Sequence, residues 1–128
     1  MVNICYFGTY EKNFPRNRTF INSLKKIDNF YVHECHFPLW EKTDDKTGSY
    51  FNVSSLINTS LNLVHGYTRL IRTSLPSIKK SDFLVVGYIG QLDLIVLKFL
   101  NIFYGKKIIF NPMISLYDTL ILDRKIIN

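Results

Sequence analysis

The sequence of 128 residues has little of what marks several common classes of protein. It contains only two cysteines, six glycines and one tryptophan, so a disulfide framework is not expected. Its longest apolar run, residues 92–104, is interrupted by polar side chains and is too short to span a bilayer. No charged leader followed by an apolar stretch precedes the first apolar run. We therefore expect one soluble, cytoplasmic domain over residues 1–128.

The two cysteines, Cys5 and Cys35, each lie in an apolar run that predicts a strand. A free cysteine packs as a small apolar side chain, so two buried, reduced thiols are the favoured interpretation. A disulfide between adjacent strands stays open as the alternative.

The chain is basic, with a formal net charge of +6, but its basic residues are spread along the sequence in short pairs. It contains no run of five or more Lys and Arg residues, which argues against a nucleic-acid-binding arm. We expect no nucleic-acid partner. An anionic membrane surface or a phosphorylated ligand remains a candidate partner for this charge.

Hydrophobic periodicity predicts an alternation of strands and helices. Strands are expected at residues 3–7, 30–37, 83–87 and 108–111, and helices at 18–27, 54–75, 92–103 and 116–127. Helix-length spacers between the strands predict an α/β fold: a Rossmann-like, open parallel sheet of about four strands with helices on both faces.

Local signals predict how each helix is bounded and which side it buries. Asn17 is the expected N-cap of the first helix, and Pro76 is expected to stop the second. The apolar side of the second helix should include Leu61, Val64 and Leu70. The third helix is apolar on nearly every side, which predicts that it is buried, and a glycine after it is typical of a helix end.

The strand ends lack the common phosphate-binding and catalytic motifs. Gly8 ends the first strand without companion glycines, which disfavours a GxGxxG dinucleotide site. GxxxxGK[ST] and GxSxG motifs are also absent. His33 and His36 point to opposite faces of a strand, so a shared metal site is disfavoured. We expect neither a cofactor nor a metal.

The carboxyl ends of parallel strands share one edge of the sheet, where open α/β sheets bind ligands. Arg16, with neighbouring basic residues, is a candidate for holding an anion beside a helix N-terminus, with a solvated loop as the alternative. Asp93 and Asp118 are candidates for this edge or simple helix caps. The expected cleft-lining residues are Gly8, Thr9, Tyr10, Arg16, Tyr88, Gly90, Gln91, Asp93, Pro112, Ser115 and Asp118.

Three stretches together, residues 4–10 with 15–17, residues 82–88 and residues 110–119, carry a family resemblance. Their order and spacing are similar to the N-terminal domain of GT-B glycosyltransferases of family 4. The resemblance implies a domain that binds a glycan or lipid-linked acceptor. It also implies that a nucleotide-sugar donor would be bound only by a second domain or a second chain, so this chain alone is expected to be inactive.

A second hypothesis is a non-catalytic, flavodoxin-like module that binds a phosphorylated ligand or an anionic membrane. It would use the basic loop 12–18 for either partner. The resemblance itself suggests a further membrane contact, because acceptors of that family are often lipid-linked or membrane-proximal, and basic residues of the second helix would suit peripheral contact with the cytoplasmic membrane face. Those helix residues are Arg69, Arg72, Lys79 and Lys80, for which a solvated helix face is the alternative. A small nucleotide-binding protein is the weakest hypothesis, because Gly8 stands alone.

Overall fold

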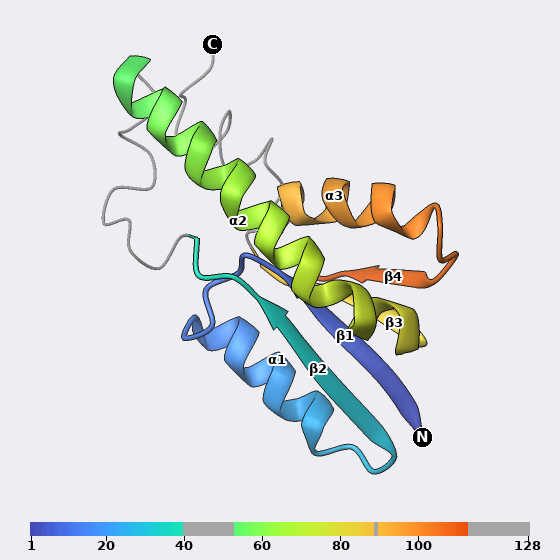
Figure 1. Cartoon of the computed structure of the whole chain (residues 1–128). Coiled ribbons are helices and arrows are strands. Elements are labelled where there is room, and N and C mark those ends of the chain that lie inside the picture. Colours follow the sequence, from blue (N-terminus) through green and yellow to red (C-terminus); the bar gives the residue numbers. More distant parts are fainter. Residues whose placement is uncertain (40–52, 89, 113–128) are drawn as a thin grey trace.

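The computed structural model describes residues 1–39, 53–88 and 90–112. The elements are β1 (Val2–Gly8), α1 (Pro15–Lys25), β2 (Phe30–His36), α2 (Val53–Lys80), β3 (Phe83–Val86), α3 (Gln91–Asn101) and β4 (Lys107–Phe110). The four strands form one parallel sheet in the order β2-β1-β3-β4 (Figure 1). The predicted α/β class and the open parallel sheet are confirmed. The helix expected at 116–127 lies outside the described residues.

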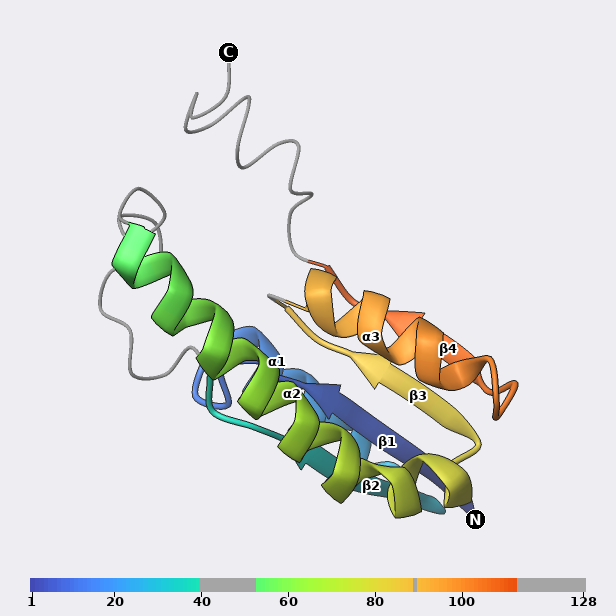
Figure 2. The same cartoon turned by 45° about the horizontal axis from the view of Figure 1, so that its top comes forward.

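Helices cover both faces of the sheet, as predicted. α1 lies on one face, and α2 and α3 lie on the other (Figures 1 and 2). Successive strand side chains point to opposite faces, so β1, β2 and β3 each contribute side chains to two cores. The α1-side core consists of Ile4, Tyr6, Tyr10, Ile21 and Val85. The core under α2 and α3 consists of Cys5, Phe7, Cys35, Leu70, Ile78, Leu84, Val86 and Leu97.

The first helix begins earlier than predicted, and the prediction that Asn17 is its N-cap is wrong. The helix starts at Pro15, and the capping position is Phe14, whose side chain makes no capping hydrogen bond. Proline suits the first helical position, because its fixed φ matches the helix and its missing N–H would have no partner there. Asn17 is thereby placed inside the first turn, where it is buried against the sheet.

The second helix continues through Pro76 to Lys80, so the prediction that Pro76 stops it is also wrong. A proline inside a helix removes one hydrogen bond and crowds the preceding turn. Pro76 lies on the exposed side of α2, where water can satisfy the carbonyl that loses its partner. The cost is therefore local, and packing of the buried side of α2 sustains the last turn.

Among the side chains of α2 that the structure describes, the buried ones lie in its second half. Leu70 is buried as predicted, but Leu61 and Val64 are 64% and 67% exposed, which corrects the predicted apolar side. Figure 1 shows why: the first half of α2 projects past the edge of the sheet. The buried positions are four residues apart, as expected for one helix face: Gly66, Leu70, Ser74 and Ile78.

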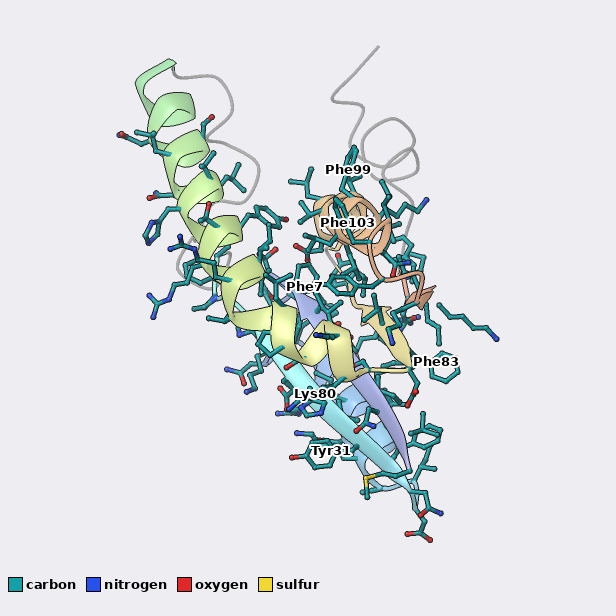
Figure 3. The ribbon with its side chains drawn as sticks, turned by 45° about the vertical axis from the view of Figure 1, so that its right-hand side comes forward. Phe7, Tyr31, Lys80, Phe83, Phe99 and Phe103 are labelled. Atoms are coloured by element: carbon teal, nitrogen blue, oxygen red, sulfur yellow. The ribbon has the colours of Figure 1, made fainter. Side chains whose placement is uncertain are left out.

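The prediction that α3 is buried is wrong for its outer side. Leu97 is fully buried, whereas Phe99 is 67% exposed and Phe103, in the turn after α3, is 85% exposed. Figure 3 labels both phenylalanines beside α3. The helix covers the sheet with one side only, so its outer apolar residues face away from the core. Gly105 does not cap the helix as expected, because α3 ends at Asn101 with Ile102 at its C-cap. Gly105 instead ends the turn that follows, with φ of +61° and its N–H donated to the carbonyl of Asn101.

Candidate functional site

The carboxyl ends of β1 and β3 mark the point where the chain connections diverge. From β1 the chain passes through α1 on one face to β2, and from β3 it passes through α3 on the other face to β4 (Figure 2). Such a divergence leaves a crevice outside the strand ends, which is where open α/β sheets bind ligands. The residues that follow β1 and β3 are therefore the candidate site.

Asp93, in the first turn of α3, ties the end of β1 to this helix. Its carboxylate accepts hydrogen bonds from the Thr9 backbone N–H at 2.9 Å, the Thr9 hydroxyl at 3.0 Å and the Tyr67 hydroxyl at 2.7 Å. The side chain is 1% exposed. Asp93 is thus a buried link between three elements, and its position near a helix N-terminus favours its negative charge.

Burial raises the pKa of Asp93 above its ordinary value, and the hydrogen bonds from Tyr67 and Thr9 oppose that rise. Burial likewise raises the pKa of Tyr67, and the neighbouring carboxylate of Asp93 adds to the effect. Both shifts follow from placing ionisable groups where water has little access.

Gly8 allows Asp93 to come this close to the strand end. A Cβ at Gly8 would lie 2.4 Å from Oδ2 of Asp93, and its φ of +149° is one that side chains rarely adopt. Glycine is therefore required here by an internal contact, whether or not a ligand binds nearby.

Asn17 makes the equivalent link on the α1 side. Its Oδ1 accepts hydrogen bonds from the Tyr88 backbone N–H at 3.1 Å and from the Tyr6 hydroxyl at 3.2 Å. Its Nδ2 donates to the carbonyl of Glu11 at 3.1 Å. Asn17 thus joins the loop after β1, the strand β1 itself and the turn that follows β3. Burial raises the pKa of Tyr6 to about 12, so its hydroxyl remains a donor in this network.

The rim of this edge is formed by α1 and the end of β4. Arg16 donates from Nη2 to Oδ1 of Asn111 at 2.8 Å, which bridges the first turn of α1 to the residue after β4. Beside this contact is a shallow groove of about 520 Å³, lined by Pro15, Arg16, Thr19, Phe20, Ser23 and Asn111. An aromatic pair lies at the same edge: the rings of Phe14 and Tyr88 are 4.8 Å apart and inclined at 33°.

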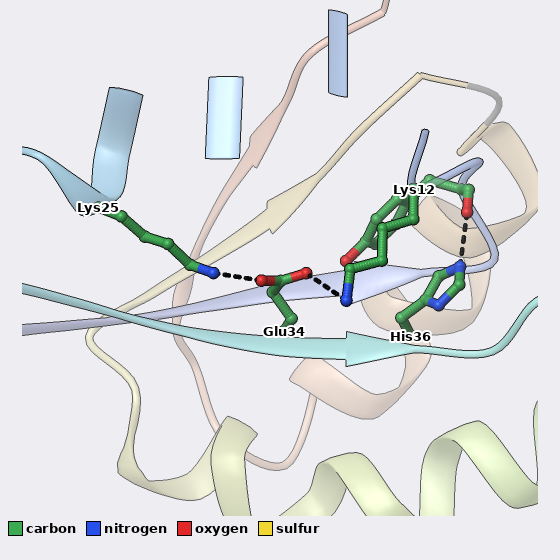
Figure 4. A network of polar contacts seen from close by, with 5 residues as sticks. Lys12, Lys25, Glu34 and His36 are labelled. Atoms are coloured by element: carbon green, nitrogen blue, oxygen red, sulfur yellow. Dashed lines mark hydrogen bonds and ion pairs between the residues drawn. The ribbon is translucent and has the colours of Figure 1, made fainter. Parts of the chain in front are cut away.

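Tyr10 is turned inward rather than toward the rim. Its ring is fully buried against Tyr6 and His36. Its carbonyl oxygen lies 2.7 Å from Nε2 of His36, which Figure 4 labels with this contact as a dashed line. The same figure shows Glu34 between Lys25 and Lys12, with Lys12 Nζ 3.2 Å from Oε2 of Glu34. Burial opposes ionisation of Glu34, but the hydrogen bonds from Lys25 and Lys12 outweigh it and lower the pKa of this carboxyl.

The structure brings most of the predicted residues together but divides them into two groups. Gly8, Thr9, Tyr10, Gly90 and Asp93 are buried and bonded or packed internally. The outer group, which is exposed or half-buried, consists of Arg16, Tyr88, Gln91 and Pro112. Ser115 and Asp118 lie outside the described residues.

Three residues of this edge were not among the predicted ones. Asn17 was assigned to a helix cap, although Pro15 signals an earlier helix start and would have placed Asn17 in the first turn. Asn111 follows a strand and was therefore expected at the carboxyl edge of the sheet, but nothing in the sequence pairs it with Arg16. Tyr67 has no local signal, because its contact with Asp93 depends on how α2 crosses the sheet.

Comparisons with protein-family models, with curated proteins and with solved structures find no match to this chain. What the structure supports is an α/β domain with a four-stranded parallel sheet.

Within residues 1–39, 53–88 and 90–112, no group of three His, Cys, Asp or Glu side chains is placed to hold a metal ion. No helix in the same part of the chain is both long and apolar enough to cross a membrane.

Proposed function

We propose that this chain is the acceptor-binding domain of a two-part glycosyltransferase, with the acceptor held at the carboxyl edge between β1 and β3. The observation that supports this most is the contact between Arg16 and Asn111. It brings α1 and the end of β4 to the rim of the switch point, the place between the ends of β1 and β3 where the chain connections diverge. The inner residues Thr9 and Asp93 are engaged with each other, so the outer group does the binding.

The chemistry of this rim suits a sugar linked to a lipid phosphate. A guanidinium has five N–H donors in a planar fork that matches phosphate oxygens, and the contact with Asn111 uses the side chain's Nη2. The Phe14 and Tyr88 rings offer flat apolar surface for a sugar ring or a prenyl chain. Gln91, half-buried at the start of α3, supplies an amide for sugar hydroxyls.

The binding test is an NMR titration of the isotope-labelled chain with a short-chain prenyl diphosphate carrying one sugar. Resonances of Arg16, Tyr88 and Gln91 should shift. Arg16→Ala and Tyr88→Ala should each weaken binding by about tenfold, which corresponds to about 1.4 kcal/mol. Arg72→Ala is the matched control, because it removes the same charge from an exposed position on α2. Equal weakening by Arg16→Ala and Arg72→Ala would indicate unspecific charge attraction and would count against acceptor binding at the rim.

Sugar transfer needs a separate test, because one wall of a cleft cannot hold both substrates. The full chain is mixed with a separately produced donor-binding domain, a nucleotide sugar and the same acceptor. Transfer that depends on both polypeptides supports the proposal. Acceptor binding without any transfer would leave the domain a binding module and overturn its assignment to a transferase.

The runner-up function is peripheral binding to an anionic membrane through α2. This helix contains no Asp or Glu, and the side chains of Arg69, Arg72, Lys79 and Lys80 are all exposed. α1 and α2 lie on opposite faces of the sheet (Figure 2), so we expect a membrane bound along α2 to leave Arg16 uncontacted. Vesicles containing phosphatidylserine should therefore lose affinity on Arg72→Ala with Lys79→Ala and not on Arg16→Ala, and the reverse pattern would exclude this function.

A further inference from the structure

The two cysteines of the chain lie side by side in the core under α2. In the β1–β2 register Phe7 is opposite Cys35 and Cys5 is opposite His33, so the cysteines are diagonal neighbours on one face of the sheet. The Cys5 thiol donates to Sγ of Cys35, with the two sulfur atoms 3.3 Å apart. No other cysteine exists in the sequence to compete for either thiol.

The two thiols differ in access. Cys5 is fully buried, on a strand with a neighbour on each side. Cys35 is on the edge strand β2 and is 8% exposed. It lines a groove of about 330 Å³ between β2 and α2, together with Glu34, His36, Phe37, Arg69, Leu70, Thr73 and Ser77. A small polar molecule in this groove meets Cys35 first.

The surroundings of Cys35 also favour its thiolate. The hydrogen bond from Cys5 lowers the pKa of Cys35, burial opposes this, and the hydroxyl of Ser77 lowers the pKa further. The pKa of Cys5 is raised, because its proton is donated to Cys35 and because it is buried. The thiolate is the reactive form of cysteine, so access and chemistry point to the same residue.

We propose that Cys35 is a peroxide-reactive thiol and that Cys5 is its resolving partner, so that a hydroperoxide entering the groove converts the pair into an intramolecular disulfide. This inference is independent of the proposed acceptor site, which lies between the ends of β1 and β3 and shares no lining residue with the groove beside Cys35.

The reaction takes two steps. The Cys35 thiolate attacks one oxygen of hydrogen peroxide, the O–O bond breaks, and the leaving hydroxide takes up a proton as water, which leaves a sulfenic acid on Cys35. Sγ of Cys5 then attacks Sγ of Cys35, the S–O bond breaks, and the departing hydroxide leaves as water with the proton that Cys5 loses. In sum, two thiols and one peroxide give one disulfide and two waters.

The test uses the full native chain and hydrogen peroxide, with intact-mass and peptide-mass measurements. The wild-type chain should lose two hydrogen atoms and yield a Cys5–Cys35 cross-linked peptide that dithiothreitol cleaves. Oxygen addition at Cys35 without the cross-link would overturn the resolving role of Cys5. Reaction of both thiols only after unfolding would overturn the proposal as a whole.

Two single variants separate the roles. Cys5→Ser should accumulate a sulfenic acid on Cys35 that dimedone traps, and Cys35→Ser should leave Cys5 as a thiol at the same peroxide dose. Because both positions are buried, circular dichroism must show that each variant is folded. A measurement on the wild type gives the same answer without substitution: iodoacetamide should label Cys35 before Cys5, and the opposite order would overturn the assignment.

A milder variant tests the local chemistry. Ser77→Ala removes one hydroxyl near Cys35 and should slow its oxidation several-fold at neutral pH, with the difference vanishing at alkaline pH where the thiol ionises without help. Thr73→Val is the matched control. It removes a hydroxyl from the same groove, but that hydroxyl donates to the carbonyls of Arg69 and Leu70. Equal slowing by both variants would exclude a specific role for Ser77.

Discussion

Two buried polar side chains, Asp93 and Asn17, meet the two strand ends at the switch point. Both are 1% exposed, and both join a strand end to a helix on the opposite side of the crevice. Asp93 is charged when ionised and accepts three hydrogen bonds from Thr9 and Tyr67. Asn17 is neutral and both accepts and donates, because one of its partners is the carbonyl of Glu11.

The difference shows how partner chemistry selects each residue. The Thr9 N–H, the Thr9 hydroxyl and the Tyr67 hydroxyl all donate to Asp93, and a carboxylate can satisfy all three with its lone pairs. At Asn17 a carboxylate would face the Glu11 carbonyl, whereas an amide supplies the donor needed there. The charged link has the larger cost of burial and therefore depends more strongly on keeping its partners.

The largest effect is expected for Asp93→Ala. Removing the carboxylate leaves the Thr9 N–H, the Thr9 hydroxyl and the Tyr67 hydroxyl without their acceptor, which should lower the free energy of unfolding by about 3 to 4 kcal/mol. Asp93→Asn keeps an acceptor oxygen and the side-chain volume, so a loss of about 1 to 2 kcal/mol is expected. Urea denaturation measures both.

Asp28→Ala is the control for the loss of a negative charge, since Asp28 is exposed and should change stability by less than about 0.5 kcal/mol. If Asp93→Ala and Asp93→Asn destabilise equally, the hydrogen bonds from Thr9 and Tyr67 are not the source of the stability that Asp93 provides. The comparison with Asn17 would then have no basis.

A smaller effect is expected for Asn17→Ala, of about 2 to 3 kcal/mol in the same assay, because the lost partner is neutral. Asn17→Asp should be comparably harmful despite its equal size, since its carboxylate would face the Glu11 carbonyl. A tolerated Asn17→Asp together with a harmful Asn17→Ala would mean that the donor role of the amide is unimportant.

A pair of tyrosines serves as the control for this second prediction. Tyr6→Phe removes the hydroxyl that donates to Asn17 and should cost about 1 kcal/mol. Tyr10→Phe removes a buried hydroxyl that has no hydrogen-bond partner in the described part of the chain, so stability should stay the same or rise. Equal losses of unfolding free energy for the two variants would show that the hydrogen bond from Tyr6 to Asn17 does not contribute to stability.

The elements that the sequence predicts best are those whose pattern is decided locally. β1 and β2 are found within a residue of their expected bounds, because apolar and β-branched residues between clear breakers define them. The errors in the predicted buried sides of α2 and α3 have one cause: a helix pattern does not reveal where the sheet beneath it ends. Leu61 and Phe99 belong to apolar stripes, yet they lie beyond or opposite the sheet.

The candidate site shows the same limit: residues with a local signal were predicted, and contacts between distant segments were not. The glycines that follow strands predicted that the site lies at the carboxyl edge of the sheet, with Gly8, Tyr88 and Asp93 among its residues. The partners of Asp93 could not be predicted, because Tyr67 reaches it from 26 residues away through the path of α2. The division into buried and outer residues likewise depends on packing, which the sequence pattern does not contain.

The smallest effect, and the sharpest test of the comparison, is the pH dependence of the Asp93 link. Burial raises the pKa of Asp93 above its ordinary value of 3.8, so between the two values the native state holds a proton that the unfolded state has released. Stability from this group therefore falls as pH rises through that window and is constant above it. Asn17 has no proton to lose and should give no such slope.

The difference in unfolding free energy between the wild type and Asp93→Asn, measured by urea denaturation from about pH 3 to pH 7, isolates this contribution. Glu34 would otherwise obscure it, because the lowered pKa of Glu34 gives stability that is lost as pH falls. Glu34 is present in both chains and cancels. The advantage of the wild type should be largest at the acid end and shrink as pH rises. An advantage that grows with pH would mean that the hydrogen bonds from Tyr67 and Thr9 outweigh burial, and that Asp93 is stabilised by its charge.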